Sequence, residues 1–338
     1  MLAGQLALAV AVVASAAALA SALIYFLRTL LIRYLLAHPN ARSSHAVATP
    51  QGAGVTVILA LLIVAVAAWM LWGARGDAVT LVPVLAAAAG LTVLGLADDA
   101  RALPVGWRLL GQTLAALVMV LSLPEGLRLF PDFLPLMVER ALLVLGTVWF
   151  VNAVNFLDGL DWITAAQVVP MTLGVAVLQA LGAVPASVGF LALALLGAML
   201  GFAMFNKHPA QVFLGDAGSL PIGLLLAFML IFVAGTDLAA ALLLALYTIA
   251  DSTITLIRRA LNRKAIFSAH RSHFYQRAVI AGMTPPQVTA RIFGLGLLLA
   301  ALAIAAVIAN STLADVLLLA LGAIATFYVL YRLARGAK

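Results

Sequence analysis

The stretch VNAVNFLDGLD (151–161) places polar side chains at every third position, at the end of the apolar run LLVLGTVWF. These side chains are two amides followed by two carboxylates: Asn152, Asn155, Asp158 and Asp161. On a continuing helix, residues three apart are neighbours, so the four would form one polar face. Gly159 can instead end the helix and turn the acids inward. Alone, the segment leaves two alternatives, a reaction centre and a plain helix end meeting water.

A second pair of carboxylates, Asp98 and Asp99, lies in GLADDARALP, where another apolar run ends. Adjacent carboxylates repel each other unless a cation or a proton relieves the repulsion. Pairs of hard oxygen ligands suit Mg²⁺. This pair therefore indicates either a magnesium-dependent site or an ordinary solvated loop.

A third segment, FNKHPAQVFLGDAGSLPIG (205–223), surrounds Asp216 with glycines. An acid flanked by glycine before a new helix can place a carboxylate and free backbone N–H groups beside a phosphate. The segment lacks the GK[ST] ending of a Walker A loop. Phe213 can stack on a nucleobase or pack against its neighbours. A tight interhelical turn is the alternative for the whole segment.

A fourth segment, RRALNRKAIFSAHRSHFYQR (258–277), is strongly basic and contains His270, Arg271 and His273. Basic loops anchor membrane proteins on the cytoplasmic side. Two histidines with an arginine between them can also hold a phosphate, because arginine offers a planar fork of donors. A zinc site is disfavoured, since no third ligand follows at helical spacing.

The composition identifies the elements that must position these groups. The chain has 338 residues, of which 65% are hydrophobic and 9% charged, and its mean hydropathy is +1.18. These values indicate a polytopic membrane protein, and residues 1–338 contain no polar stretch long enough to form a second domain. Cysteine is absent, which excludes disulfides and thiolate metal sites. The pI of about 10.2 is attributed to basic loops, and no nucleic-acid partner is expected.

We expect an all-α membrane helix bundle of about eleven transmembrane helices, or ten if two neighbouring segments form one re-entrant hairpin. The first apolar run is interpreted as an uncleaved span rather than a signal peptide, because basic residues follow it instead of preceding it. The expected spans are 2–27, 53–73, 79–97, 106–123, 138–156, 163–181, 187–205, 218–234, 238–257, 288–309 and 312–331.

The basic residues predict the orientation. With the N-terminus outside, only Arg75, Arg128 and Arg140 among the 19 Lys and Arg residues fall on the outer side. Short loops rich in Lys and Arg remain in the cytoplasm, so the C-terminus is expected there. The inner side then also receives all five histidines and six carboxylates: Asp98, Asp99, Asp158, Asp161, Asp216 and Asp251. This asymmetry predicts a reaction centre at the cytoplasmic face, with carboxylates that hold Mg²⁺ and cations that hold a diphosphate.

Together the motifs resemble those of the polyprenyl-phosphate N-acetylhexosamine-1-phosphate transferase superfamily, glycosyltransferase family 4. The matching pieces lie between Pro39 and Arg277 and occur in the order of the family: PNARSSHAVATPQGAG, LGLADDARALP, NAVNFLDGLD, FNKHPAQVFLGDAGSLPIG and AHRSHFYQR. The forms RSSH and AHRSHFYQR look most like the branch that initiates O-antigen synthesis.

The resemblance implies transfer of an N-acetylhexosamine 1-phosphate from a UDP-sugar to undecaprenyl phosphate, with release of UMP, in the inner membrane of a bacterium. The expected cofactor is Mg²⁺, with Mn²⁺ as a substitute. The expected partners are undecaprenyl phosphate, UDP-N-acetylhexosamine and membrane lipid, and a homodimer is compatible with the family. The pathway would be O-antigen or a related cell-envelope polysaccharide, and the sugar stays open.

The resemblance also implies roles for single residues. Asp216 would bind the metal, and Asp98 would be either the base that deprotonates the lipid phosphate or an organiser of metal and phosphate. Asp99 and Asp158 would belong to the same catalytic cluster. Residues expected to bind substrate are Asn155, Asp161, Asn206, Phe213, His270, Arg271 and His273.

Three residues depart from the family pattern: Gln51 and Ala53 in PQGAG, and Trp162 after DGLD. They affect the details of binding more than the reaction class. A secondary transporter is the alternative function, because carboxylates inside membranes also mark ion pathways. A transporter would place its polar groups near the bilayer midplane, often in two related halves, and no internal repeat is visible here.

Overall fold

A computed structural model describes residues 2–37, 48–72, 77–264 and 270–336, and 80% of these described residues are helical. The first predicted loop, with His38 and His45, lies mostly outside the described residues, as does Arg75. The elements are α1 (Leu2–Tyr34), β1 (Leu36–Ala37), β2 (Thr49–Pro50), α2 (Gly54–Trp72), α3 (Ala78–Ala100), α4 (Val105–Leu121), α5 (Leu136–Phe156), α6 (Ile163–Ala180), α7 (Ala186–Phe205), α8 (Asp216–Thr236), α9 (Leu238–Leu261), α10 (Phe274–Ile280), α11 (Pro285–Ala309) and α12 (Thr312–Arg335).

The expected membrane helix bundle is confirmed. Within the described residues, ten helices are long and apolar enough to cross a membrane, and α4 is a shorter apolar helix of 17 residues. Each predicted span overlaps one of these helices. The short helix α10 and the antiparallel pair β1–β2 were not predicted, since neither has an apolar run of spanning length.

Local sequence signals account for several helix ends. Prolines precede α4, α5 and α7, where their fixed φ suits a helix start. Asp237 caps α9 by accepting the N–H of Ala240 at 2.9 Å. Thr284 and Gln287 form a capping box at the start of α11.

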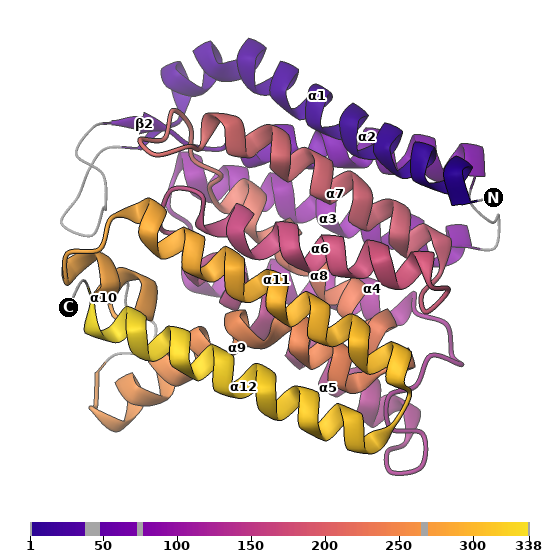
Figure 1. Ribbon diagram of the computed structural model, residues 1–338. Helices are drawn as coiled ribbons and strands as arrows, with labels where there is room; N and C mark the ends of the chain where they lie inside the picture. Colours follow the sequence, from indigo (N-terminus) through magenta and orange to yellow (C-terminus); the bar gives the residue numbers. More distant parts are fainter. Residues whose placement is uncertain (1, 38–47, 73–76, 265–269, 337–338) are drawn as a thin grey trace.

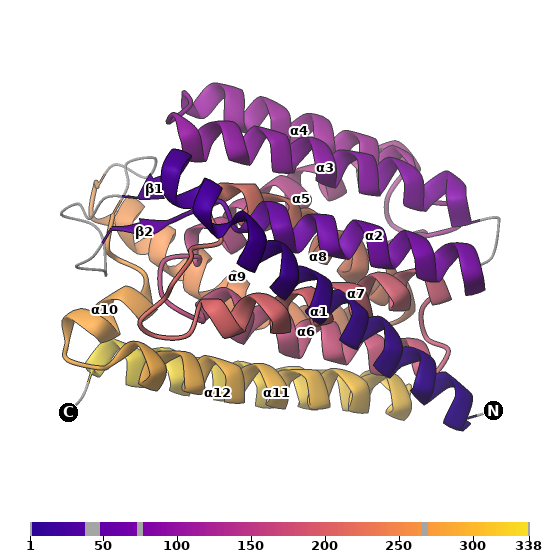
Figure 2. The ribbon, with the colours of Figure 1, turned by 90° about the horizontal axis from the view of Figure 1, so that it is seen from above.

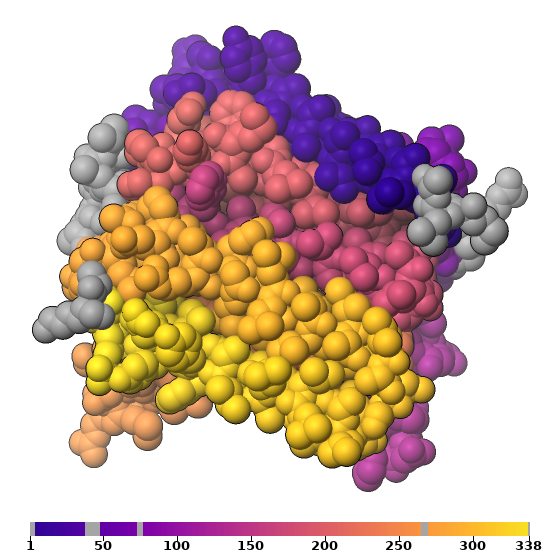
Figure 3. All heavy atoms as spheres, viewed as in Figure 1, coloured from indigo at the N-terminus to yellow at the C-terminus, as the bar shows by residue number. Residues whose placement is uncertain are grey.

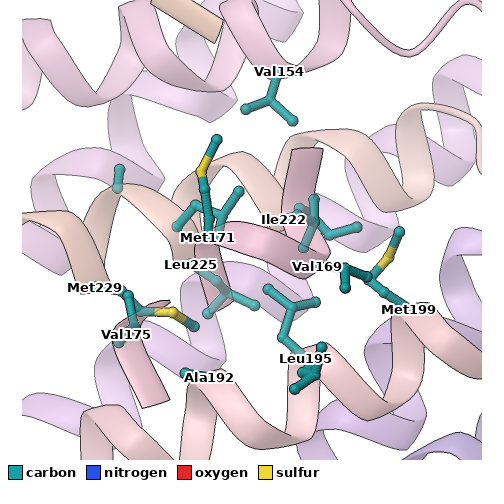
Figure 4. Packing of buried hydrophobic residues seen from close by; sticks show 14 of the residues in the cluster. Val154, Val169, Met171, Val175, Ala192, Leu195, Met199, Ile222, Leu225 and Met229 are labelled. Carbon is teal, nitrogen blue, oxygen red and sulfur yellow. The ribbon is translucent and has the colours of Figure 1, made fainter. Parts of the chain in front are cut away.

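The long helices run along one common direction, as Figures 1 and 2 show from two sides. Helix α8 lies at the centre, and 89% of its most apolar 18-residue stretch is buried. Helix α12 lies at the edge, and only 17% of its corresponding stretch is buried. Helices α1, α7, α11 and α12 form much of the face in Figure 3. Inside, α5, α6, α7 and α8 meet through residues such as Val154, Met171, Leu195 and Leu225 (Figure 4).

Glycines allow the backbones of α2 and α3 to approach α8 closely. A Cβ on Gly54 would lie 2.2 Å from the Cα of Gly218, and a Cβ on Gly95 would lie 2.2 Å from the backbone oxygen of Asp216. Small residues at such crossings are a common means of packing helices in membranes. These contacts place the start of α8 directly beside the end of α3.

The start of α1 and the end of α12 lie at opposite ends of the bundle (Figure 1). This agrees with an odd number of passes through the bundle. The strands, α10 and the end of α12 gather at one end, seen on the left in both ribbon views. Which side of a membrane this end faces stays a prediction based on the basic residues.

Candidate active site

Asp99 binds the beginning of the central helix. Its Oδ1 accepts the N–H of Asp216 at 3.0 Å, and its Oδ2 accepts the N–H of Ala217 at 3.1 Å. Gly215 precedes the helix with φ of 72°, and a Cβ there would lie 2.3 Å from Asp99 Oδ2. Only glycine therefore permits this approach. Both oxygens of Asp99 are engaged, so its carboxylate positions the start of α8.

The neighbouring Asp98 faces a different partner. It accepts the N–H of Leu103 at 2.6 Å and a bond from Arg108 Nη1 at 3.2 Å. The same nitrogen of Arg108 lies 3.7 Å from Asp216 Oδ2. One guanidinium thus stands between the carboxylates of Asp98 and Asp216. Arg108 was not predicted, although its signal is visible as the single charge within α4.

The predicted polar face of α5 is present, and it joins the same cluster. Asn155 donates to Asp216 Oδ1 at 2.8 Å and to Ser219 Oγ at 2.9 Å. One turn earlier, Asn152 donates to Gln112 of α4 at 2.6 Å. The two amides therefore connect α5 to α8 and to α4.

Helix α5 ends at Phe156, so the two acids that follow it do not continue this face. Asp158 accepts the hydroxyl hydrogen of Thr164. Burial raises the pKa of Asp158 to about 7, the charge of Asp99 adds to the rise, and the bond from Thr164 opposes it. A carboxyl group with this pKa exchanges its proton near neutral pH.

Asp161 is only 1% exposed, and it holds the loop between α7 and α8. Its Oδ2 lies 2.6 Å from His208 Nδ1 and accepts the N–H of Ala210 at 3.2 Å. Its predicted contact with a nucleoside stays a prediction, and in this structure the carboxylate orders the loop.

Asn206 and Phe213 lie in that same loop. Asn206 accepts the N–H of Trp162 at 2.7 Å and donates to the carbonyl of Val212 at 2.9 Å. The N–H of Phe213 donates to the carbonyl of Pro50 at 2.8 Å. The loop is therefore bonded to β2 on one side and to the turn before α6 on the other.

The departures from the family pattern take part in these contacts. Gln51 donates to the backbone oxygen of Asp99 at 2.7 Å. Trp162 has a left-handed φ of 65°, and its ring nitrogen donates to the carbonyl of Ala203 at 2.6 Å. Ala53 is fully buried, and its N–H donates to the carbonyl of Phe213 at 3.1 Å. All three hold the loops at the site end of the bundle.

His270 and His273 stack on each other, with ring centroids 5.0 Å apart. Burial lowers the pKa of His270 to about 4, and the nearby His273, Arg259 and Arg258 add to the decrease. His270 is therefore neutral at physiological pH. Arg271, which lies between the two histidines in the sequence, is half-buried in the structure. Its Nε has no hydrogen-bond partner among the described residues.

A cleft of about 540 Å³ joins several of these groups. Its polar part contains Arg108, Gln112, Asn152, Asn155, Asp216, His270, His273 and Gln276. Its apolar part contains Val105, Leu109, Leu145, Val148, Trp149, Phe156 and Leu256. Leu145 and Trp149 are exposed on the side of α5, so the apolar part is open along the helices. Of the predicted site residues, four line this cleft, whereas Asp161, Asn206 and Phe213 lie in the adjoining loop.

The donor set fits a magnesium ion held by two carboxylates. Mg²⁺ commonly takes one or two protein carboxylates and completes its shell with water and substrate phosphates. The guanidinium of Arg108 lies near both Asp98 and Asp216. These two carboxylates would hold the Mg²⁺ ion, because the oxygens of Asp99 already accept backbone N–H groups. Among the described residues no group of three or more His, Asp or Glu side chains is arranged as a metal site. Phosphate oxygens would therefore supply the remaining ligands.

The fold and the cleft define a class, a polytopic helical membrane protein with a polar site at one end of its bundle. Residues 81–234 match the model of the family described as glycosyl transferase family 4. This match and the similar curated proteins support the polyprenyl-phosphate N-acetylhexosamine-1-phosphate transferase superfamily.

Curated relatives agree with this assignment. The chain is 27% identical over 259 residues to a probable undecaprenyl-phosphate N-acetylglucosaminyl 1-phosphate transferase of Bacillus subtilis, covering 73% of this chain and 70% of the relative. It is 29% identical over 302 residues to the decaprenyl-phosphate N-acetylglucosaminephosphotransferase of Mycobacterium leprae, covering 76% and 73%. It is 34% identical over 200 residues to the phospho-N-acetylmuramoyl-pentapeptide-transferase of Desulforudis audaxviator, covering 52% and 60%.

Proposed function

We propose that this protein transfers an N-acetylhexosamine 1-phosphate from a UDP-sugar to undecaprenyl phosphate and releases UMP. An oxygen of the lipid phosphate would form a bond to the β-phosphorus of the UDP-sugar, and the bond from that phosphorus to the bridging oxygen of UMP would break. The product, an undecaprenyl-diphospho-sugar, would initiate O-antigen or a related envelope polysaccharide. The protein would lie in the inner membrane of a bacterium, with its site on the cytoplasmic face.

The observation that carries the proposal is the two-part cleft. Its apolar side, along α4 and α5, suits a prenyl chain, and its polar end suits phosphates. Two cleft-lining groups have buried nitrogens without hydrogen-bond partners among the described residues, Arg108 Nε and His270 Nδ1. Buried polar atoms normally have partners, so such groups are suited to bind a substrate that supplies them.

The side chains have distinct roles in this reaction. Arg108 would bind phosphate oxygens and balance the carboxylates beside it. A bound Mg²⁺ on Asp98 and Asp216 would neutralise charge on the diphosphate. Asn155 orients Asp216 through its bond to Oδ1. Asp161, Asn206 and Phe213 order the loop proposed to receive the uridine.

The transporter alternative receives less support. The acids of the cluster lie at the end of α3 and in the first turn of α8, at one end of the bundle. A transporter concentrates its polar groups near the bilayer midplane. The remainder of α8 contains no charged residue.

The test uses the purified full chain in lipid nanodiscs that contain undecaprenyl phosphate. We expect UMP and a lipid-linked diphospho-sugar with UDP-N-acetylglucosamine or another UDP-N-acetylhexosamine, loss of both with EDTA, and recovery with Mg²⁺ or Mn²⁺. Asp216→Asn should reduce turnover at least about 100-fold, whereas Asp77→Asn, at the opposite end of α3, should not. Absence of product with every donor would reject the proposal.

A further inference from the structure

Asp251 is an ionisable residue within the apolar helix α9, and it is 0% exposed. A carboxylate inside a membrane helix is costly unless partners compensate it, and such residues generally have a function. The contacts of Asp251 connect it to His273, a residue of the basic segment 258–277.

Asp251 is surrounded by donors. Its Oδ2 accepts the hydroxyl of Tyr247 at 3.2 Å, and its Oδ1 accepts the N–H of Phe274 at 3.1 Å. The hydroxyl of Thr255 lies 3.4 Å from the same Oδ1. A carboxyl group that accepts from several donors is present as the acceptor-only carboxylate. His273 Nδ1, at 3.1 Å from Oδ1, must therefore be the donor in that contact.

The orientation of His273 follows from this bond. In the neutral tautomer with its proton on Nδ1, the ring would carry a lone pair on Nε2, at its opposite edge. The ring stacks on His270 at 5.0 Å and on Tyr275 at 5.9 Å between centroids, which limits its rotation. His273 also lines the 540 Å³ cleft, so in this tautomer Nε2 would be the ring nitrogen left to bond a ligand.

We propose that Asp251 is a positioning residue that fixes the tautomer of His273, so that Nε2 accepts a hydrogen bond from an O–H group of a substrate in the cleft. The substrate assignment rests on the proposed transferase function. Two sources have the required chemistry, a hydroxyl of the sugar nucleotide and the protonated phosphate of the lipid.

A double-mutant cycle in nanodiscs tests the dependence of Asp251 on His273. Asp251→Asn and His273→Asn should each lower kcat/KM about 100-fold, the size of effect found when one hydrogen bond to a reacting substrate is lost. The double variant should lose no more than His273→Asn alone, because Asp251 acts through that ring. Losses that multiply would overturn the proposal. An increase confined to KM for the UDP-sugar assigns the O–H group to the nucleotide, and an increase confined to KM for the lipid assigns it to the lipid phosphate.

Thr172→Val is the matched control, because Thr172 is also 0% exposed and bonds only to backbone oxygens of its own helix, at 2.8 Å from Val168. It removes a buried polar group without contact to the cleft. We expect kcat/KM to remain within about twofold of the wild type, since substitutions outside a site have small effects.

A spectroscopic measurement decides the tautomer without relying on catalysis. Nitrogen-15 NMR of histidine-labelled protein identifies the His273 signals as those lost in His273→Asn. We expect a protonated Nδ1 and an unprotonated Nε2 in the wild type, and a changed pattern in Asp251→Asn. The opposite tautomer in the wild type would overturn the proposal. A wild-type protein with this tautomer but without transferase activity would reject the proposed function alone.

Discussion

The carboxylate of Asp99 holds the first two backbone N–H groups of α8, including that of Asp216 at 3.0 Å. Asp98, one residue earlier, instead contacts Arg108 and shares this cation with Asp216. Two adjacent acids of the same type therefore make different contacts. Asp99 organises the backbone of the central helix, and Asp98 belongs to the charged cluster in which a metal and phosphates would bind.

Substitutions should separate the two acids. Asp99→Ala removes the cap of α8, which should lower the stability of the folded protein by about 1 kcal/mol, the usual value of a helix cap. Asp98→Asn should leave the thermal midpoint nearly unchanged and lower turnover at least about 100-fold. Thermal unfolding in detergent and the UMP-release assay measure the two effects. An unchanged midpoint in Asp99→Ala would contradict the capping role.

Packing between α3 and α8 should control the geometry of the cluster. Gly95→Ala places a methyl group 2.2 Å from the backbone oxygen of Asp216, so α8 must shift and carry Asp216 away from Asp98. We expect reduced turnover together with a lower thermal midpoint. Gly90→Ala is the control on the same helix, because no atom lies within 4 Å of its Cβ. Equal effects from the two variants would show that helix propensity, rather than the close contact, is responsible.

The protonation of Asp158 should be visible in the pH dependence of stability. Burial and the charge of Asp99 raise its pKa from 3.8 to about 7. The folded state therefore keeps the proton to higher pH than the unfolded state. The stabilisation is complete below pH 3.8 and is lost as the pH rises through about 7.

Asp158→Asn cannot ionise, so it should avoid this loss. The thermal midpoint of the variant relative to the wild type should rise between pH 4 and pH 7 and remain constant above that, while its turnover is reduced. Asp132→Asn, at an exposed position, serves as the control and should show a difference that does not vary with pH. A flat difference for Asp158→Asn as well would show that folding does not raise the pKa of this carboxyl group.

The orientation can be tested with single cysteines, because the native chain has none. Ala281→Cys and Asp132→Cys are both at exposed positions, at opposite ends of the bundle. In spheroplasts, a membrane-impermeant thiol reagent should label Asp132→Cys at once and Ala281→Cys only after permeabilisation, since the basic end is expected in the cytoplasm. The reverse pattern would place the cleft outside the cell.

The helices were predictable to within a few residues at most ends, because a membrane requires long apolar runs and the loops interrupt them. Asn155 stood out in the sequence as a polar group at the end of an apolar run, and it bonds to Asp216 in the structure, while its role in binding substrate stays a prediction. Arg108 was not predicted and Asp251 was placed at the inner face without a role, because the partner of each lies on another element, at Asp216 and at His273. Only tertiary packing brings such pairs together. The short helix α10 lacked a signal because its seven residues span fewer than two full turns.

The apolar side of the cleft, bordered by Leu145 and Trp149, has a consequence for how the two substrates reach the protein. A prenyl phosphate that enters between helices would stay in the bilayer, so it would reach the protein by lateral diffusion in two dimensions. The nucleotide sugar arrives from the aqueous volume. The half-saturating amount of lipid should therefore scale with its mole fraction among the surrounding lipids and be independent of the total volume of the sample, whereas that of the nucleotide should scale with molar concentration.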